Sequence, residues 1–399
     1  MKITNDFDIA TRCVHFDRVE SSDPYGAIAP PIYQTATFRQ SSATEFGEYD
    51  YTRSGNPTRA LLERQLAALE GGEYALAFAS GMAALTALAR LLSPGDEIIA
   101  GNDLYGGTVR LFDQVVSRQG TVVSYVDTTD LTAVRDRITS RTKLVLIETP
   151  SNPLLRISDI AALAALSHQV GAILVVDNSM LSPCLQQPLN LGADVVVHSA
   201  TKFLCGHSDV TAGALITNNE SLHQRLAFQQ NAEGSGLSPF ESWLLLRGIK
   251  TLALRVERQN LSAQIIAEQL SRFAAITKVY YPGLSTHCGY ELNHRQSKGA
   301  GAVISFTTGD PQLSKRIVEA TKVFEIAVSF GSVGSVISLP CQMSHASIPK
   351  ALREQLAPPR DLIRLSVGIE AVDDLLQDLE QAFWRATEVR QRKVVALGR

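Results

Sequence analysis

Short, continuous runs of β-branched and other apolar residues constrain the fold of this chain more than any other feature. Six of them, between residues 96 and 217, read DEIIAG, GTVVSYVD, TKLVLIET, GAILVVDNS, ADVVVHS and AGALIT. Because these runs do not alternate between apolar and polar residues, we expect strands that are covered on both faces. Helical segments lie between them, which favours a mostly parallel, doubly wound α/β sheet.

The 399 residues are too many for one ordinary core, so we expect three parts. Residues 1–54 are rich in Pro, Tyr, Thr and Ser and have little helical period, which predicts an extended arm ordered against something else. Residues 55–253 carry the sheet and form the predicted large domain. Residues 254–399 begin with a long charged helical pattern and contain fewer strand-like runs, which predicts a smaller α+β domain.

Composition excludes several classes of partner. The 37 basic and 40 acidic residues give a net charge of −3, and the absence of a dense basic stripe argues against nucleic acid as the main partner. No apolar run approaches the ~20 residues of a membrane span, and the first residues include acidic ones, so we expect a cytoplasmic protein without membrane association. The five cysteines are scattered without metal-ligand spacing, which predicts free thiols and no metal site.

Polar residues follow three of the predicted strands, in the segments ETPSNP, VVDNS and HSATK. Ligands of open α/β sheets collect at such strand ends. Lys202 comes just after a buried run, where a low pKa would make its amine a nucleophile able to form a Schiff base. Asp177, one strand earlier, suits the protonated nitrogen of a pyridine ring. This combination indicates pyridoxal phosphate (PLP) as the cofactor.

The same cofactor needs a phosphate site and a flat partner for its ring. Gly81 and Met82 open an alanine-rich helix, whose free N–H groups and dipole bind anions, and Ser199 and Thr201 add hydroxyl donors. Tyr105, at the end of the DEIIAG strand, is a candidate for stacking on the ring. Each element alone also fits an ordinary structural role, whereas their occurrence together in this order favours a cofactor site.

These segments resemble the Cys/Met transsulfuration group of fold-type I PLP-dependent enzymes over about residues 10–385. The motifs YTRSGNPTR, FASGMAA, LYGGT, ETPSNP, VVDNS, HSATKFLCGHSDV and IRLSVGIE occur in the order found in that family. The resemblance implies the fold-type I transferase fold, with a mostly parallel seven-stranded sheet in the large domain, a smaller α+β C-terminal domain and an N-terminal arm.

The resemblance also implies roles for individual residues. Lys202 would be the Schiff-base lysine and the catalytic acid/base, Asp177 the partner of the pyridine nitrogen, and Tyr105 the stacking and catalytic tyrosine. The cofactor phosphate would lie on Gly81, Met82, Ser199 and Thr201. The carboxylate of an amino-acid substrate would be bound by Arg364, helped by Asn152 and Ser329.

Two residues of the arm are implied to act in another subunit. Tyr51 and Arg53 would reach the cofactor phosphate of the neighbouring subunit, with Tyr51 also near its substrate. The resemblance therefore implies a homodimer as the smallest active unit, and a homotetramer built from two such dimers.

The reaction is implied by two longer stretches, Gln230–Trp243 and Ile326–Pro349, which are close to the plant-type cystathionine β-lyases. They imply α,β-elimination of L-cystathionine to homocysteine, pyruvate and ammonia. γ-Lyases and γ-synthases of the group usually have Gly-Gly-x-Glu where residues 331–334 read GSVG, and methionine γ-lyases usually have a cysteine where this chain has Gly107. γ-Elimination or γ-replacement on cystathionine or a homoserine derivative stays the alternative. A Schiff-base enzyme of the aldolase type without a cofactor, or a non-enzymatic binding protein, would lack the yellow colour of lysine-bound PLP.

Overall fold

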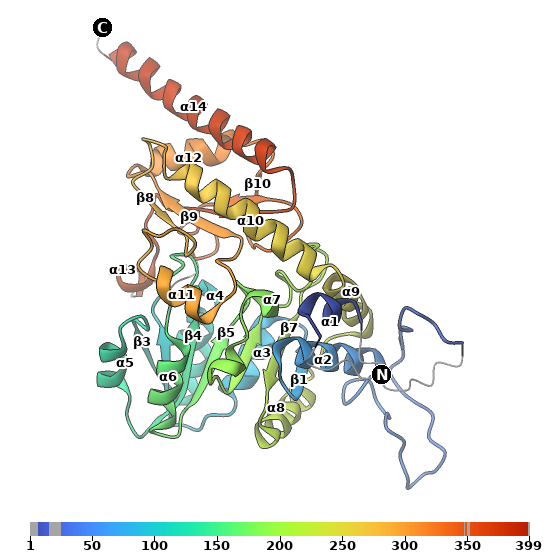
Figure 1. Ribbon diagram of the computed structural model, residues 1–399. Helices are drawn as coiled ribbons and strands as arrows, with labels where there is room; N and C mark the ends of the chain where they lie inside the picture. The colour runs from blue at the N-terminus through green and yellow to red at the C-terminus, as the bar shows by residue number, and fades with distance from the viewer. Residues whose placement is uncertain (1–6, 16–24, 347, 349–351, 398–399) are drawn as a thin grey trace.

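Two β-sheets organise the chain, and the computed structural model describes residues 7–15, 25–346, 348 and 352–397. The larger sheet, in the lower half of Figure 1, has seven strands among the described residues, in the order β1-β7-β6-β5-β4-β2-β3. β7 is antiparallel to β1 and β6, and all other neighbours are parallel. This arrangement confirms the predicted mostly parallel seven-stranded sheet. The strands are β1 (Tyr74–Phe78), β2 (Glu97–Gly101), β3 (Val122–Val126), β4 (Thr142–Glu148), β5 (Ile173–Asp177), β6 (Val195–His198) and β7 (Gly213–Thr217).

Helices cover both faces of the larger sheet, which explains why its strands are apolar without alternation. In β5, Val175 packs in the core cluster that contains residues of α3 and α8, whereas Val176 packs in the cluster that contains residues of α6. In β6, Val196 packs in a third cluster with residues of α2. The helices that precede or surround this sheet are α1 (Ile9–Val14), α2 (Pro57–Glu70), α3 (Gly81–Ala89), α4 (Gly106–Leu111), α5 (Leu131–Arg137), α6 (Ile160–His168), α7 (Ser182–Leu185), α8 (Glu220–Glu233) and α9 (Pro239–Ile249).

The sheet departs from the sequence expectation at its two edges. β3 is an edge strand that pairs only with β2, and Val122 is 43% exposed, so this strand is not covered on both faces as expected. β1 forms the opposite edge and was not predicted as a strand, because its residues belong to a run of small side chains that continues into α3. Edge positions relax the requirement for bulky apolar residues on both faces, which weakens the sequence signal there.

The smaller sheet, in the upper half of Figure 1, has the order β10-β11-β12-β9-β8. Its strands are β8 (Lys278–Tyr280), β9 (Val303–Thr307), β10 (Glu325–Ile326), β11 (Val336–Ser338) and β12 (Ile363–Ser366). The accompanying helices are α10 (Leu252–Leu270), α11 (Tyr290–Gln296), α12 (Pro311–Ala320), α13 (Arg353–Leu356) and α14 (Val372–Leu397). The predicted division at residues 253 and 254 falls within the first turn of α10, and the domain boundaries stay predictions. No helix of the described residues combines the length and the apolar character needed to cross a membrane.

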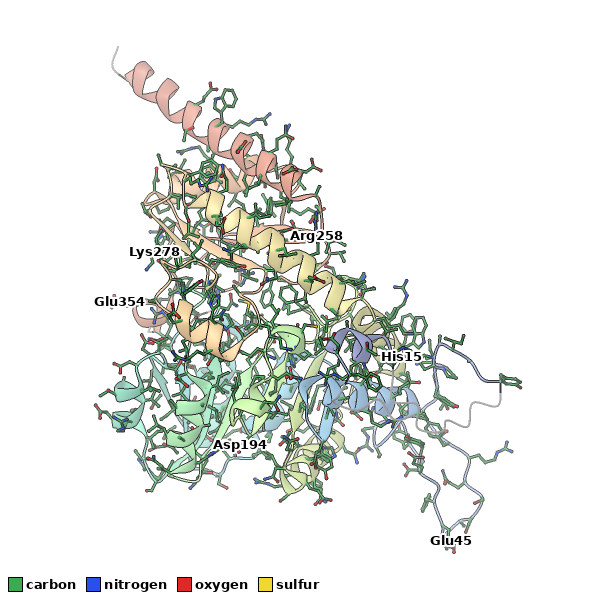
Figure 2. All side chains as sticks on the ribbon, in the orientation of Figure 1. His15, Glu45, Asp194, Arg258, Lys278 and Glu354 are labelled. Atoms are coloured by element: carbon green, nitrogen blue, oxygen red, sulfur yellow. The ribbon has the colours of Figure 1, made fainter. Side chains whose placement is uncertain are left out.

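Residues 25–56 form a segment without a helix that projects from the body of the chain (Figure 1). Its ends are held to the body by hydrogen bonds, among them those from Trp243 Nε1 to the carbonyl of Pro30 and from Arg59 to the carbonyl of Thr52. Thr37 and Tyr51 form a β-bridge within the segment. Glu45 lies far out on this segment in Figure 2. Several apolar side chains of the segment are exposed, namely Tyr25, Ile28, Ile32, Tyr33 and Phe46. The segment has the extended form predicted for the arm, but α1, within the same predicted residues 1–54, is a helix whose Cys13 is buried in the core cluster with residues of α2 and α10. The bounds of the arm stay a prediction, and its residues 1–6 and 16–24 lie outside the described residues.

A close backbone approach joins the larger sheet to the start of α3. A Cβ atom on Gly213, in β7, would lie 2.2 Å from the carbonyl oxygen of Ser80 and 2.7 Å from the amide nitrogen of Gly81. Real Cβ atoms do not come this close to backbone atoms, so only glycine fits at this position. Gly213 thereby lets the amino-terminal end of α3 lie directly against the sheet.

We predict that Gly213→Ala lowers the free energy of unfolding by about 1–3 kcal/mol, because the backbone of β7 or of α3 must move to accommodate the methyl group. Urea unfolding measures the change. Gly334→Ala is the matched control, since a Cβ atom at Gly334 meets no atom within 4 Å. Equal effects of the two substitutions would contradict the steric explanation.

Candidate active site

A cavity of about 490 Å³ lies at the carboxyl ends of β4, β5 and β6, between the larger sheet and loops that belong to the smaller one. Ten of the twelve predicted site residues line it: Gly81, Met82, Tyr105, Asn152, Asp177, Ser199, Thr201, Lys202, Ser329 and Arg364. These residues come from segments that are up to 283 positions apart in the chain, 364 minus 81. The fold therefore brings together nearly all the side chains that the sequence had singled out.

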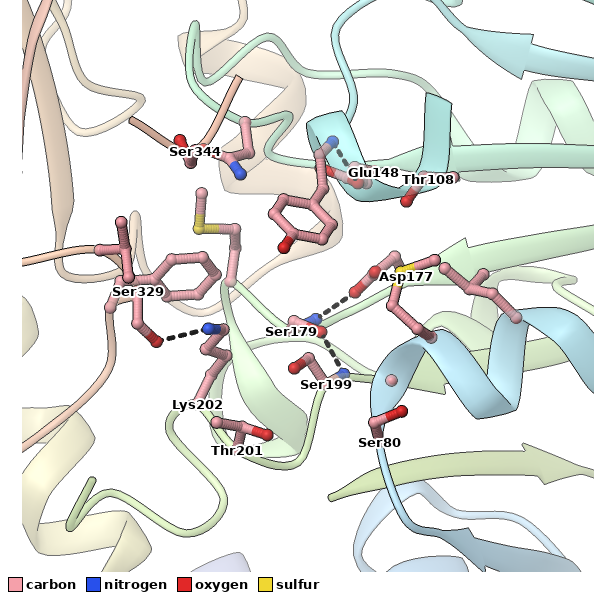
Figure 3. Close-up of a pocket in the computed structure, with 18 of the residues that line it drawn as sticks. Ser80, Thr108, Glu148, Asp177, Ser179, Ser199, Thr201, Lys202, Ser329 and Ser344 are labelled. Atoms are coloured by element: carbon pink, nitrogen blue, oxygen red, sulfur yellow. Dashed lines mark hydrogen bonds between the residues drawn. The ribbon is translucent and has the colours of Figure 1, made fainter. Parts of the chain in front are cut away.

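Lys202 lies in the turn that follows β6, with its side chain inside the cavity (Figure 3). Its ammonium nitrogen donates a hydrogen bond to Oγ of Ser329 and lies 5.0 Å from the centre of the Phe330 ring. Burial and the positive charge of Arg364 lower the pKa of Lys202 to about 8, against the opposing effect of Asp177. A substantial fraction of the amine is therefore neutral, and nucleophilic, near neutral pH.

Asp177 and Glu148 form a pair of buried carboxyl groups on neighbouring strands. They are aligned in the register of β4 with β5, and both line the cavity. Burial and the charge of Asp177 raise the pKa of Glu148 well above its usual value. Burial also raises the pKa of Asp177, but hydrogen bonds from Ser179 and the charges of His198 and Lys202 oppose the rise. Asp177 is thus the better placed of the two to carry a negative charge, as a pyridinium partner requires.

The sequence had not assigned a function to Glu148, although its position at a strand end was a usable signal. Its Oε1 accepts a hydrogen bond of 2.9 Å from the backbone N–H of Tyr105 and so anchors the start of α4. The Tyr105 ring lies over Gly107, where a Cβ atom would be 2.3 Å from Cε1 of that ring. The absence of a side chain at residue 107 therefore permits this position of the tyrosine.

The start of α3 offers the predicted anion site. Ser80 caps this helix by accepting a hydrogen bond from the N–H of Ala83, which leaves the earlier amides of the helix, those of Gly81 and Met82, at the cavity. A Cβ atom on Gly81 would lie 3.1 Å from Cα and Cβ of Ser199, so the two predicted phosphate segments approach closely. Together with Lys202 and Asp177, this arrangement of donors fits PLP.

Thr201 has a less direct relation to the predicted phosphate site. Its hydroxyl group donates to the carbonyl of Ala212 at 3.2 Å and accepts from the N–H of the same residue at 3.0 Å. A phosphate oxygen would therefore have to replace the bond to the carbonyl in order to receive the hydroxyl proton.

Arg364 on β12 has the geometry of an anion-binding group. Its guanidinium donates 2.7 Å and 2.9 Å hydrogen bonds to Oδ1 of Asn152 and to the carbonyl of Ser329, and the residue is 2% exposed. Within the described residues it forms no ion pair with a carboxylate. Burial lowers the pKa of Arg364 to about 10. A buried cation held only by neutral oxygens is a strong site for the carboxylate of a ligand.

Ser329 adopts an uncommon backbone conformation that serves both cations. Its φ angle is +83°, in the left-handed region that non-glycine residues rarely occupy. This conformation lets its carbonyl accept from Arg364 while its hydroxyl accepts from Lys202. Strain of this kind is typical of functional sites.

Tyr51 and Arg53 do not line the cavity. Both are exposed and lie together on the surface, with the guanidinium carbon of Arg53 5.5 Å from the centre of the Tyr51 ring. Arg53 also donates to the carbonyl and side-chain oxygens of Asn231 at 2.9 Å and 3.0 Å. A single chain does not test the prediction that these residues act in a neighbouring subunit.

Other cavity residues were missed by the sequence analysis. Arg110 on α4 is an exposed arginine at the cavity, and in the sequence it is indistinguishable from an ordinary solvated charge. Val328, Phe330, Met343, Ser344 and Ala346 line the cavity from loops near the smaller sheet; they belong to the stretch Ile326–Pro349, but the sequence analysis assigned none of them a role. Gly334, at the place of the glutamate in Gly-Gly-x-Glu, is exposed and outside the cavity lining.

Known proteins resemble this chain over most of its length. Residues 10–384 match the family described as Cys/Met metabolism PLP-dependent enzyme. The chain is 54% identical to cystathionine beta-lyase, chloroplastic, from Arabidopsis thaliana, over 96% of this chain and 82% of that protein. It is 51% identical to cystathionine beta-lyase from Neurospora crassa, over 96% of this chain and 83% of that one. The crystal structure of cystathionine gamma synthase from Xanthomonas oryzae pv. oryzae in complex with cystathionine is similar with a TM-score of 0.93 at 41% identity, over 96% of this chain and 99% of that one. These matches confirm the family predicted from the motifs, and with it the cofactor.

We predict that the enzyme freed of cofactor binds PLP covalently at a rate that rises with pH to a midpoint near 8, because only the neutral amine attacks the aldehyde and the pKa of Lys202 is lowered to about 8. Arg364→Gln should move the midpoint to higher pH, since it removes a neighbouring cation. Stopped-flow absorbance of the lysine-bound cofactor measures the rate. Arg110→Gln, at an exposed arginine of the same cavity, serves as the control. A wild-type midpoint at the ordinary lysine value of 10.5 is the contrary result.

Proposed function

We propose that this chain, which belongs to the Cys/Met metabolism family of PLP-dependent enzymes, is a cystathionine β-lyase that cleaves L-cystathionine to homocysteine, pyruvate and ammonia. The observation that carries the proposal is the convergence of Lys202, Asp177 and Arg364 on one cavity in a chain about half identical to enzymes of that name. The activity is that of a carbon–sulfur lyase, and the substrate is a small amino acid.

Different residues of the cavity would bind different parts of the cofactor. Lys202 would hold it covalently, Asp177 would keep a proton on its ring nitrogen, and the first amides of α3 with Ser199 and Thr201 would receive its phosphate. Tyr105 would stack on its ring. When bound, PLP withdraws electrons from the Cα atom of an amino acid attached to it.

The chain's own groups then carry the proton transfers. Arg364 and Asn152 bind the α-carboxylate of L-cystathionine and orient its Cα–H bond toward Lys202. The amino group of the substrate would displace Lys202 from the cofactor and so free its amine. Neutral Lys202 would then take the Cα proton, the Cβ–S bond would break, and Lys202 or Tyr105 would deliver a proton to sulfur so that homocysteine leaves. The remaining three-carbon fragment, 2-aminoacrylate, reacts with water to give pyruvate and ammonia.

The far half of the substrate carries a second amino group and a second carboxylate. Arg110 is the exposed cation at the cavity and is the candidate partner of that carboxylate. A γ-lyase or γ-synthase reaction is the second candidate, because one of the similar solved structures is a cystathionine gamma synthase in complex with cystathionine. β- and γ-elimination use the same groups of the chain and differ in their products.

We also propose how the chain assembles and where it works. Residues 1–54 would form an arm that carries Tyr51 and Arg53 into the site of a neighbouring subunit, residues 55–253 the large domain and residues 254–399 the small domain. The exposed apolar side chains of the arm support a homodimer, and two such dimers would form a tetramer. All five cysteines are free thiols, three of them buried, which supports the reducing cytoplasm as the compartment.

The first prediction is the set of products. Purified enzyme should be yellow and should release pyruvate and homocysteine from L-cystathionine, identified by chromatography of the keto acid and the thiol. Lys202→Ala should remove the covalent attachment of the cofactor and essentially all turnover, because it deletes the group that moves the protons. Release of 2-oxobutyrate and cysteine would make the enzyme a γ-lyase, and a colourless wild-type protein would contradict the cofactor.

The second prediction concerns the arm. Lys202→Ala and Arg53→Ala should each have little activity alone, whereas a refolded equimolar mixture should regain about a quarter of the wild-type activity, since half of randomly paired dimers contain one intact site. The regained activity is measured as pyruvate release, with each variant refolded alone as the control. A mixture no more active than the two variants would mean that Arg53 does not serve the neighbouring subunit.

A further inference from the structure

One buried histidine joins the outer wall of the cavity to the strand ends of the larger sheet. Residues 339–346, here called the wall loop, contribute Met343, Ser344 and Ala346 to the cavity lining. His345 does not line the cavity and is 2% exposed. Its Nε2 atom lies 3.1 Å from the carbonyl oxygen of Leu104 and 3.2 Å from that of Asn152, so the wall loop is attached at two places on the large sheet's site loops.

The hydrogen bonds of His345 define its protonation. Carbonyl oxygens only accept, so Nε2 carries the hydrogen, and Nδ1 of the neutral ring accepts from the Ser344 hydroxyl at 2.9 Å. Burial and the charge of Arg364 lower the pKa of His345 to about 4, although the two carbonyls oppose the shift. The ring therefore stays neutral above about pH 5, and the attachment is constant over the physiological range.

The attachment points are next to residues already placed in the site. Leu104 directly precedes Tyr105, and Asn152 accepts the hydrogen bond from Arg364. The wall loop is itself a compact turn, because the N–H of His345 donates to the carbonyl of Pro340 at 2.9 Å and the N–H of Met343 donates to that of Leu339 at 3.0 Å. The Arg353 side chain also donates to the carbonyl of Ala346 at 3.1 Å, at the end of the loop. His345 is the residue that joins the middle of this turn to the site loops of the larger sheet.

The wall lies across the cavity from the strand ends of the larger sheet. Arg364 and Lys202 take the amino-acid end of a substrate, at the strand ends and the Ser329 loop. Figure 3 shows Ser344 on a separate stretch of backbone across the cavity from Thr201 and Ser80. A thioether held by Arg364 and Lys202 at its amino-acid end would place its sulfur-linked second half along the wall or toward Arg110, and a three-carbon amino acid lacks that second half.

We propose that His345 is a positioning residue that sets the preference for long amino-acid thioethers, by holding the wall loop against the carbonyls of Leu104 and Asn152. The proposal rests on the proposed function, since it concerns the far half of the same substrate. His345 does not touch the reacting atoms. It acts through Met343, Ser344 and Ala346, whose distance from the strand ends it fixes.

The experiment compares a long and a short substrate in two variants. His345→Leu keeps the bulk but cannot donate a hydrogen bond, whereas His345→Gln keeps an N–H donor. The short substrate is β-chloro-L-alanine, which loses its Cα proton and chloride and then, with water, gives pyruvate and ammonia. We expect His345→Leu to lower kcat/KM for L-cystathionine about 30-fold, mainly by raising KM, and to change kcat/KM for β-chloro-L-alanine less than about threefold. His345→Gln should recover most of the loss.

Two further readouts separate positioning from general damage. The visible circular dichroism of the lysine-bound cofactor should be unchanged in both variants, and thermal unfolding should show that both are folded. His168→Gln is the control, because His168 is an exposed histidine that pairs with Asp194 on the surface. It should leave both substrates unaffected.

The results test the role of His345 separately from the proposed β-lyase reaction. An equal loss for both substrates, or no loss for L-cystathionine in His345→Leu, overturns the positioning role. If His345→Leu does not fold, a His345→Gln variant with wild-type selectivity supports the donor role, and one that loses selectivity overturns it. If wild-type enzyme releases 2-oxobutyrate from L-cystathionine, the β-lyase reaction is wrong, whereas the comparison of variants still decides the role of His345.

Discussion

The structure of the site depends on the burial of two cations in one cavity without an equal number of charged partners. Arg364 is held by neutral oxygens of Asn152 and Ser329, and its charge, together with burial, lowers the pKa of Lys202 to about 8. In the proposed function, the carboxylate of an entering substrate would pair with this guanidinium and so offset the cost of burying it. One interaction thus couples substrate binding to the reactivity of the lysine.

Burial also controls the charges of the two carboxyl groups at the ends of β4 and β5. Glu148 and Asp177 are in register and buried, so they cannot both be charged at little cost. Glu148 is hydrogen-bonded to the backbone of Tyr105, whereas Asp177 has the hydrogen bonds of Ser179 and the nearby positive charge of Lys202. The environment therefore assigns one carboxyl to positioning the tyrosine and the other to the charge that a pyridinium needs. A parallel sheet makes such a division simple, because adjacent strands end at the same edge.

The sequence allowed a prediction where the signal lies in neighbouring residues of the chain, and it did not where a residue acts through contacts with distant ones. The strands of the larger sheet were predictable because each is a buried run, and Lys202 and Asp177 because each ends such a run. β10 and β11 were not, since two and three residues give no period, and β1 was hidden in a run of small side chains. His345 and Arg110 gave no signal either, because their contacts are formed with residues far away in the chain. The pairing of Tyr51 and Arg53 with a neighbouring subunit came only from the family resemblance and stays a prediction.

The loop between β10 and β11 shows why sequence differences near a site need a structure to be read. Gly331 has a φ angle of +85°, and a Cβ atom there would lie 2.7 Å from the amide nitrogen of Phe203 and 3.0 Å from the carbonyl carbon of Lys202. Its glycine is therefore required by the packing of this loop against the lysine turn, whatever reaction the enzyme catalyses. Gly334, three residues later, is exposed, and a Cβ atom there would meet no atom within 4 Å, so packing does not require glycine at this position. The residues of this region that line the cavity are Val328, Ser329, Phe330 and members of the wall loop, so loops near the smaller sheet form the wall opposite the strand ends that carry Asp177 and Lys202.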